Sequence, residues 1–189
     1  MYEFLILALL MLGPKHGYLI ASIVNDMIGP YAKLSHGRLY PLLAALEAQG
    51  LVEGAGAGGG RRQRVYRVTR AGRQRFRSLA MDTGARPGEY QRLFWFKAAF
   101  FGLLEPDERR LLLDHYRTYC RTHVDHVRRE LQELEGPLGS QEVATVEQRE
   151  GILFAMRHAV EQWELEIAAV ERWREEHPDE GHPPTVPPA

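Results

Sequence analysis

Residues 34–72 of this chain read LSHGRLYPLLAALEAQGLVEGAGAGGGRRQRVYRVTRAG, and this segment decides the fold. Its first part, residues 35–49, has leucines at the spacing of one helix face, a serine at the capping position and Gly50 as the end signal. Two short apolar stretches, residues 51–53 and 65–68, predict paired strands, and the glycines between them predict a loop. The segment therefore predicts a helix followed by a β-hairpin, which is called the wing below.

The rest of the first half is predicted to be helical. Apolar positions recur at helical spacing, Gly-Pro pairs end two of the segments, and Thr69 is placed to cap a third. The predicted helices are residues 2–12, 17–28 and 70–80. Pro41 lies inside the pattern of the central helix, so we expect that helix to begin near Leu39 or to bend there.

The second half is predicted to consist of long helices. Glu105-Pro106-Asp107-Glu108 is a strong start signal, and residues 90–104 and a last helix capped by Ser140 complete the set. Apolar residues of the last helix follow alternating steps of three and four, which is typical of helices packed lengthwise. They are Leu153, Met156, Val160, Trp163, Ile167 and Val170.

These patterns predict a mainly α chain with a small β-wing, in two domains. We expect a winged helix-turn-helix domain over residues 1–81 and a helical domain over residues 89–176, joined by a hinge near residues 82–88. The proline-rich end, residues 177–189, is expected to be disordered.

Charge divides along the same boundary. Residues 1–80 carry 11 lysines and arginines against 4 acidic residues, and residues 81–189 carry 13 against 21, so the net charge of -1 conceals a basic first half. We expect only that half to bind a polyanion. The single cysteine, Cys120, excludes an intrachain disulfide and favours a cytoplasmic location. The apolar run over residues 4–12 lacks signal-peptide features and is too short to cross a bilayer, so no membrane partner is expected.

Polar residues at the start of the central helix suit duplex DNA. An arginine there can donate two hydrogen bonds to guanine, and hydroxyl groups can donate to phosphate oxygens. The candidates are Ser35, His36, Arg38 and Tyr40, with Arg38 the expected base contact. Ser35 can also cap its helix, and Tyr40 suits a core position as well as a DNA contact.

Two further groups of residues suit phosphate. Arg61, Arg62 and Arg64 form a basic cluster on the wing, where phosphate binding is favoured over a merely solvated charge run. Lys15 and Tyr18 flank backbone amides at the start of residues 17–28, although a plain tight turn explains most of that motif.

The ordered motifs together resemble the PadR family of bacterial transcriptional regulators. They are GPKHGY at residues 13–18, LSHGRLYPLLAALEAQGLV at residues 34–52 and RRQRVYRVTRAG at residues 61–72. The second half is similar to the longer helical C-terminal domain of part of that family, called the virulence-activator α type. The glycine-rich wing departs from the family pattern, so contacts at its tip are not carried over.

The resemblance implies a winged-helix repressor that binds palindromic operators as a homodimer, with double-stranded DNA as the partner. It places the dimer interface on the C-terminal helices, where the apolar stripe Leu153, Met156, Val160, Trp163, Ile167 and Val170 is the expected contact. It also implies a small aromatic effector near that interface. Phe94, Trp95 and Phe96 are candidates for the effector site, although such aromatic clusters are more often plain core. The same DNA contacts serve activation as well as repression, depending on where the operator lies.

Other classes of function are less well supported. His115, Cys120, His123 and His126 follow one helix, which offers at most two ligands on one face, so neither a metal nor another cofactor is expected. The sequence suggests no nucleophile–base pair and contains no phosphate-binding loop before a helix, so these patterns do not indicate an enzyme. A winged-helix protein-interaction module without DNA binding is the remaining alternative, and the arginines of the wing argue against it.

Overall fold

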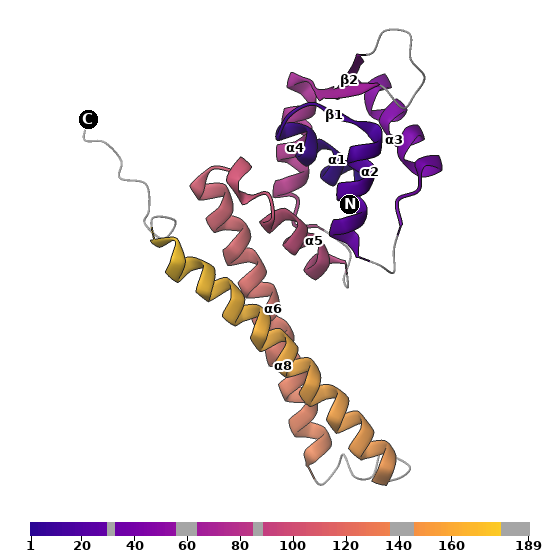
Figure 1. Ribbon diagram of the computed structural model, residues 1–189. Coiled ribbons are helices and arrows are strands. Elements are labelled where there is room, and N and C mark those ends of the chain that lie inside the picture. Colours follow the sequence, from indigo (N-terminus) through magenta and orange to yellow (C-terminus); the bar gives the residue numbers. More distant parts are fainter. Residues whose placement is uncertain (30–32, 56–63, 85–88, 137–145, 179–189) are drawn as a thin grey trace, which may run out of the picture. The chain divides into compact units, whose positions relative to one another are not determined.

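Figure 1 shows a computed structural model of the chain, which describes residues 1–29, 33–55, 64–84, 89–136 and 146–178. These residues form two compact units, Met1–Glu105 (unit 1) and Pro106–Ala189 (unit 2). Unit 1 combines helices with one small antiparallel sheet, and unit 2 is helical where it is described. The predicted fold class, mainly α with a small β-wing, is confirmed.

Helix α1 (Tyr2–Met11) is the centre of unit 1. All seven residues from Phe4 to Leu10 are buried, and the helix contacts α2 (Gly17–Ile28), α4 (Arg70–Met81) and the sheet. A helix buried on every side needs no polar face, which explains its continuous apolar sequence. On α4, only one face is buried, and its Phe76 ring stacks on Phe4 with centroids 5.5 Å apart.

The sheet has three strands in the order β1-β3-β2. Strands β2 (Val52–Ala55) and β3 (Val65–Val68) form the predicted hairpin, in which Val52 pairs with Val68 and Ala55 with Val65. Strand β1 (Lys15–His16) pairs with the other edge of β3 and was not predicted. Two residues are too few to show the alternation by which a strand is recognised in a sequence.

Helix α3 (His36–Ala48) buries Leu39, Leu43 and Leu46 on one face. It begins at His36, earlier than the start near Leu39 considered above, so Pro41 lies inside the helix. Proline lacks the N–H that would bond to the Gly37 carbonyl, and its ring crowds that carbonyl.

The turn after α3 agrees with the sequence. Gly50 has a φ of 68°, the left-handed geometry predicted for it. The Thr69 hydroxyl accepts a hydrogen bond from the Gly72 amide (3.0 Å) and donates to the Gly50 carbonyl (2.6 Å). Thr69 therefore caps α4, as predicted, and ties the start of α4 to the end of α3. A Cβ atom at Gly72 would lie 2.0 Å from the Leu51 carbonyl oxygen, so glycine is required there.

Helix α5 (Tyr90–Ala98) and the short 3-10 helix η2 (Phe101–Leu103) belong to unit 1. Arg92 donates a hydrogen bond to the Ile28 carbonyl (3.0 Å), and Lys97 donates to the Asp82 carbonyl. The units consequently divide after Glu105 and not between residues 81 and 89, where the sequence placed the boundary. Composition indicates that residues 82–88 form a linker, but it does not show whether the following helix, α5, packs on the residues before it or on the residues after it.

Unit 2 contains the antiparallel pair α6 (Pro106–Glu135) and α8 (Val146–Glu176), which lie side by side in Figure 1. Arg157, early in α8, forms an ion pair with Glu135 at the end of α6 (2.6 Å). Far along α8, Glu171 pairs with Arg117 near the start of α6 (3.3 Å). The two helices therefore run in opposite directions along their shared length.

The apolar stripe of α8 packs against α6 of the same chain. Leu153 and Val170 are buried, and the Trp163 ring contacts the rings of Tyr119 (5.6 Å) and His123 (4.5 Å). The stepwise pattern was correctly taken as lengthwise helix packing. Its partner in the structure is α6, whereas the sequence suggested a second copy of the chain.

Two buried polar groups on α6, the Tyr116 hydroxyl and the Cys120 thiol, stay protonated at neutral pH. The Tyr116 hydroxyl donates to the Glu166 carboxylate (2.8 Å), and burial raises the pKa of Tyr116. Cys120 is buried, and burial raises the pKa of its thiol to about 12, so little reactive thiolate forms at neutral pH.

Two further properties concern the described residues alone. Among them, no group of three or more His, Cys, Asp or Glu side chains is placed to hold a metal ion. None of the helices in this part of the chain combines the length and the apolar character that a membrane crossing requires.

Lys97 predicts a pH dependence of stability. Its side chain is 1% exposed, and burial lowers its pKa to about 8 from the ordinary 10.5, an effect that Asp82 only partly offsets. Between these pH values the unfolded chain binds more protons than the folded chain at this position. The Lys97 contribution to the free energy of unfolding should therefore rise from pH 8 to pH 10.5.

The measurement is urea unfolding of the wild type and of Lys97→Met across that pH range. Tyr116 and Cys120, whose pKa values are raised, act in the opposite sense in both proteins, so the difference between the two curves isolates Lys97. We expect the advantage of Lys97→Met over the wild type to shrink as pH rises. A difference that stays constant across this pH range would contradict the assignment.

Candidate nucleic-acid interface

A side-chain amide fixes the chain where α3 begins. Asn25 of α2 accepts a hydrogen bond from the Leu34 amide (2.6 Å) and donates to the Leu34 carbonyl (3.3 Å). Leu34 itself is buried, one residue before the N-cap residue Ser35. Both backbone groups of Leu34 are thus held by one side chain, and the direction in which α3 starts is set. Sequence reasoning missed Asn25, because a single amide on an amphipathic helix carries no distinctive pattern.

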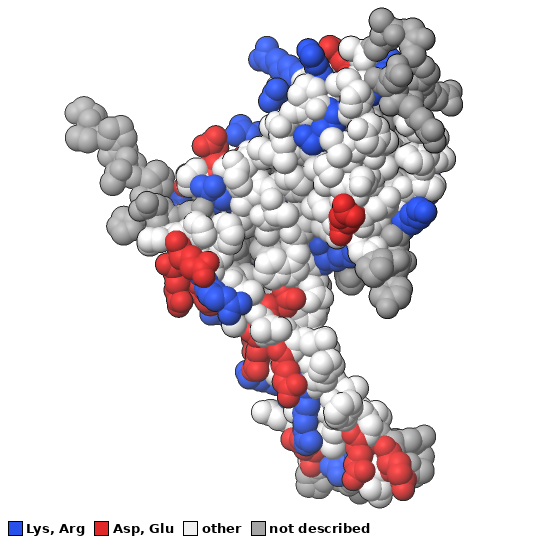
Figure 2. All heavy atoms as spheres, in the orientation of Figure 1, with Lys and Arg blue, Asp and Glu red and all other residues white. Residues whose placement is uncertain are grey.

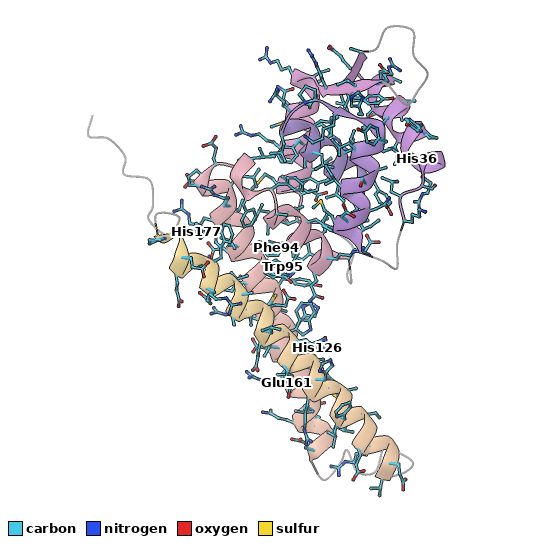
Figure 3. The ribbon with its side chains drawn as sticks, viewed as in Figure 1. His36, Phe94, Trp95, His126, Glu161 and His177 are labelled. Atoms are coloured by element: carbon cyan, nitrogen blue, oxygen red, sulfur yellow. The ribbon has the colours of Figure 1, made fainter. Side chains whose placement is uncertain are left out.

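The first turn of α3 is exposed. Ser35, His36, Gly37 and Arg38 are all exposed, while Leu39 directly after them is fully buried. Figure 3 shows His36 at the outer edge of this helix. The Ser35 carbonyl accepts the amides of Arg38 (3.0 Å) and Leu39 (2.9 Å), but the Ser35 side chain forms no capping bond. The predicted capping role is therefore limited to the backbone position of Ser35.

Arg38 is held at the surface by an aromatic ring. Its guanidinium carbon lies 5.3 Å from the centroid of the Tyr2 ring of α1. A cation–π contact at an exposed site is worth roughly 0.5–1 kcal/mol, enough to bias the side chain without committing its hydrogen-bond donors. Arg38 is therefore exposed and partly ordered before any partner binds.

Tyr40 packs between helices. A Cβ atom at Gly17, the first residue of α2, would lie 3.0 Å from the Tyr40 ring, and the His36 ring lies 6.0 Å from it. The Tyr40 hydroxyl oxygen is buried, with no hydrogen-bond partner among the described residues. Of the two alternatives left by the sequence, this placement favours the packing role.

The candidate phosphate contacts around the start of α2 differ in exposure. Tyr18 is 54% exposed and stacks on His16 with ring centroids 5.7 Å apart. Lys15 is half-buried and donates a hydrogen bond to the Gly13 carbonyl (3.3 Å). Tyr18 is therefore better placed than Lys15 to contact an outside partner.

Of the three arginines of the predicted basic cluster on the wing, the structure describes Arg64 alone. Arg61 and Arg62 lie outside the described residues. Arg64 donates a hydrogen bond to Glu47 of α3 (2.7 Å) and another to the Gly54 carbonyl of β2 (3.1 Å). Its guanidinium thus already has an anionic partner within the protein. Sequence reasoning did not single out Glu47, which lies on α3 among ordinary helix-forming residues.

A cavity of about 240 Å³ lies between α3 and β3. It is lined by Tyr40, Pro41, Ala44, Glu47, Arg64 and Tyr66. Burial raises the pKa of Tyr66, which keeps its hydroxyl protonated beside the Glu47–Arg64 pair. The polar side chains of Glu47 and Arg64 therefore connect α3 to the wing beside this cavity.

The candidate effector residues of α5 are mostly core. Phe94 is 1% exposed and Phe96 9%, whereas Trp95 is 39% exposed. The Phe94 and Trp95 rings meet edge to face with centroids 5.2 Å apart, and Figure 3 labels both on α5. Of the three, only Trp95 presents a substantial surface to solvent.

Surface charge follows the division expected from the sequence. In Figure 2, basic side chains gather over the end of unit 1 that carries the sheet, and acidic and basic side chains alternate along α6 and α8. Arg67, Arg70 and Arg73, at the end of β3 and the start of α4, are exposed. Unit 1 is therefore the part that suits a polyanion.

Comparison with solved structures gives distant matches along most of the chain. The structure of Bacillus subtilis PadR in complex with operator DNA is 20% identical, covers 90% of this chain and 94% of that chain, and gives a TM-score of 0.39. The Vibrio cholerae virulence activator AphA is 22% identical, with coverages of 93% and 97% and a TM-score of 0.39. Both TM-scores are below 0.5, so a family relationship has to be judged from the sequence. No curated protein matches the chain.

The sequence match covers the part of the chain in which the candidate interface lies. Residues 6–78 match the model of the Transcriptional regulator PadR-like family, which spans α1 to α4 and the three-stranded sheet. Members of this family are transcriptional regulators and not enzymes. Residues 6–78 of this chain are therefore similar to the PadR-like family of transcriptional regulators.

Proposed function

We propose that the chain is a homodimeric repressor that binds double-stranded DNA at a palindromic operator. The observation that carries this proposal is the exposed first turn of α3. Asn25 holds the backbone just before this turn by hydrogen bonds to Leu34, and Arg38 in the turn lies against the Tyr2 ring. A helix whose N-terminal turn is exposed and whose opposite face is buried can place that turn in the major groove.

Each residue then has a defined role on DNA. Arg38 reads a guanine edge, and Ser35 and His36 contact the same groove or its phosphates. Tyr18 lies in the first turn of α2 and Lys15 in β1 just before it, where the backbone amides that begin α2 favour a phosphate. Arg61 and Arg62 of the wing supply further phosphate contacts. Bound over a promoter, such a protein represses transcription, and at a more distant operator the same contacts support activation.

A dimer is supported by apolar side chains on the outside of α8. Phe154 is 75% exposed and Leu165 66%. They are separated by about three helical turns and so lie on one face of the helix. Leu153 and Val170, the two ends of the apolar stripe, are buried within the chain, and we place the contact with a second copy on the outer face defined by Phe154 and Leu165.

Loss of Arg38 should weaken operator binding. Arg38→Ala removes one base contact, which should cost about 1–3 kcal/mol and relax the preference at one operator position. The measurement is a fluorescence-anisotropy titration with the DNA upstream of the chain's own gene and with single-base variants of it. Arg172→Ala, which removes an exposed arginine from unit 2, serves as the matched control. Equal affinity and equal base preference in Arg38→Ala and wild type would remove this assignment.

Charges on the outer face of α8 should separate the subunits. Phe154→Asp combined with Leu165→Asp places two carboxylates in the proposed apolar contact, where burial of unpaired charge is strongly unfavourable. Sedimentation equilibrium should show a dimer for wild type and a monomer for the double variant. Ile152→Asp, on another side of α8, is the control and should remain dimeric. A monomeric wild type, or a dimeric double variant, would refute the proposed contact.

The proposal includes release by a small aromatic effector at α5. Trp95 is its exposed aromatic surface, so 4-hydroxybenzoate and related aromatic acids should quench its fluorescence. Trp95→Phe separates this signal from that of Trp163 and Trp173. An unchanged wild-type spectrum, or an equal change in Trp95→Phe, would speak against an effector site at α5.

A further inference from the structure

We propose that Glu47 and Arg64 form a latch that sets the position of the wing relative to α3, so that Arg64 is a positioning residue and not a phosphate contact. The consequence for DNA binding rests on the function proposed above. The latch itself is a property of the protein without DNA.

One carboxylate oxygen joins three elements. Glu47 lies in the last turns of α3, and its Oε1 accepts the Gly54 amide of β2 (3.1 Å) and Nη2 of Arg64 at the start of β3 (2.7 Å). The same Nη2 also donates to the Gly54 carbonyl (3.1 Å). The helix that presents Arg38 and both strands of the wing therefore meet at this pair of side chains.

The backbone of β2 is adapted to this crossing. A Cβ atom at Gly54 would lie 2.3 Å from Nε and 2.7 Å from Cζ of Arg64, so any other residue would displace the guanidinium. Below it lies the buried ring of Tyr66, 5.7 Å from the guanidinium carbon. Gly54 and Tyr66 are also paired in the sheet. The arginine thus contacts a glycine, an aromatic ring and a carboxylate, while 40% of its side chain stays exposed.

Packing alone does not fix this part of the wing. The cavity of about 240 Å³ separates α3 from β3, and the Glu47–Arg64 pair is part of its lining. Side chains are not close-packed across this hollow, so the hydrogen bonds of Glu47 are a direct connection between the helix and the wing there.

Charge argues against Arg64 as a phosphate contact. The Glu47–Arg64 pair has no net charge, so it contributes little to attraction of a polyanion. If Arg64 turned toward a phosphate, the half-buried Glu47 would lose its cationic partner and repel the same phosphate. Phosphate binding by the wing must then come from other basic residues.

The first test follows the Gly54 amide in the full chain without DNA. Glu47→Ala removes its acceptor and should accelerate hydrogen exchange of Gly54 roughly tenfold, the order expected for loss of one hydrogen bond. Arg64→Ala should accelerate it as well, and the double variant should exchange no faster than Glu47→Ala, because both changes break one unit. Glu53→Ala and Arg67→Ala alter neighbouring charges on the same strands and should leave Gly54 unchanged.

The second test uses DNA. A latch predicts that Glu47→Ala and Arg64→Ala both weaken binding severalfold while the salt dependence stays that of wild type. A phosphate contact predicts that Arg64→Ala lowers the salt slope by about one and that Glu47→Ala tightens binding. Either of these last results, or unchanged Gly54 exchange in both single variants, would overturn the latch. If wild type binds no DNA, the proposed function fails, and the exchange experiment still decides on the latch.

Discussion

The arrangement of unit 1 depends on the one-sided burial of α3. Leu39, Leu43 and Leu46 are in the core, so the opposite side and the first turn must face outward. Burial fixes how the helix is rotated about its axis, but it does not fix where the helix begins or what stands beside its end. Polar side chains supply that information. Asn25 holds the backbone before the first turn, and Glu47 reaches from the last turns to the wing.

Both units are stabilised by burial of apolar helix surfaces, but the arrangement of the helices differs. In unit 1, a fully buried helix, α1, allows α4 and the sheet to close around it. In unit 2, α6 and α8 bury apolar side chains against each other along one stripe, with an ion pair near each end of it. Because Leu153 and Val170 of that stripe are buried within the chain, we propose that a contact with a second copy uses another face. Exposed apolar side chains on α8 are the feature of the described residues that suits it.

Most of the secondary structure could be predicted from the sequence, because it is written in local patterns. Gly50 ends α3 and Thr69 caps α4 as their residue types indicate. What the sequence could not provide is the partner of each surface. Periodicity shows that Leu153 and Val170 share an apolar stripe, but both α6 and another subunit can cover it. For the same reason, composition alone does not show that Arg92 of α5 bonds back to Ile28, in the compact unit that ends at Glu105.

The candidate site shows the same limit. The exposed turn with Arg38 could be predicted, because residue types and helix position suffice for it. Asn25 and Glu47 could not, because an amide or a carboxylate on a helix is ordinary until its hydrogen-bond partner is known. The role of Arg64 changes for this reason, since an arginine beside a glycine-rich loop suggests phosphate until a carboxylate is found against it.

The central claim is that two copies of unit 1 present their α3 helices to one duplex. Hydroxyl-radical footprinting on the DNA upstream of the chain's own gene tests it most directly. We expect two symmetric protected stretches, with centres about one helical turn, roughly 10 base pairs, or a multiple of it apart. A single protected stretch without symmetry, or no protection at a concentration where the protein is dimeric, would contradict the claim.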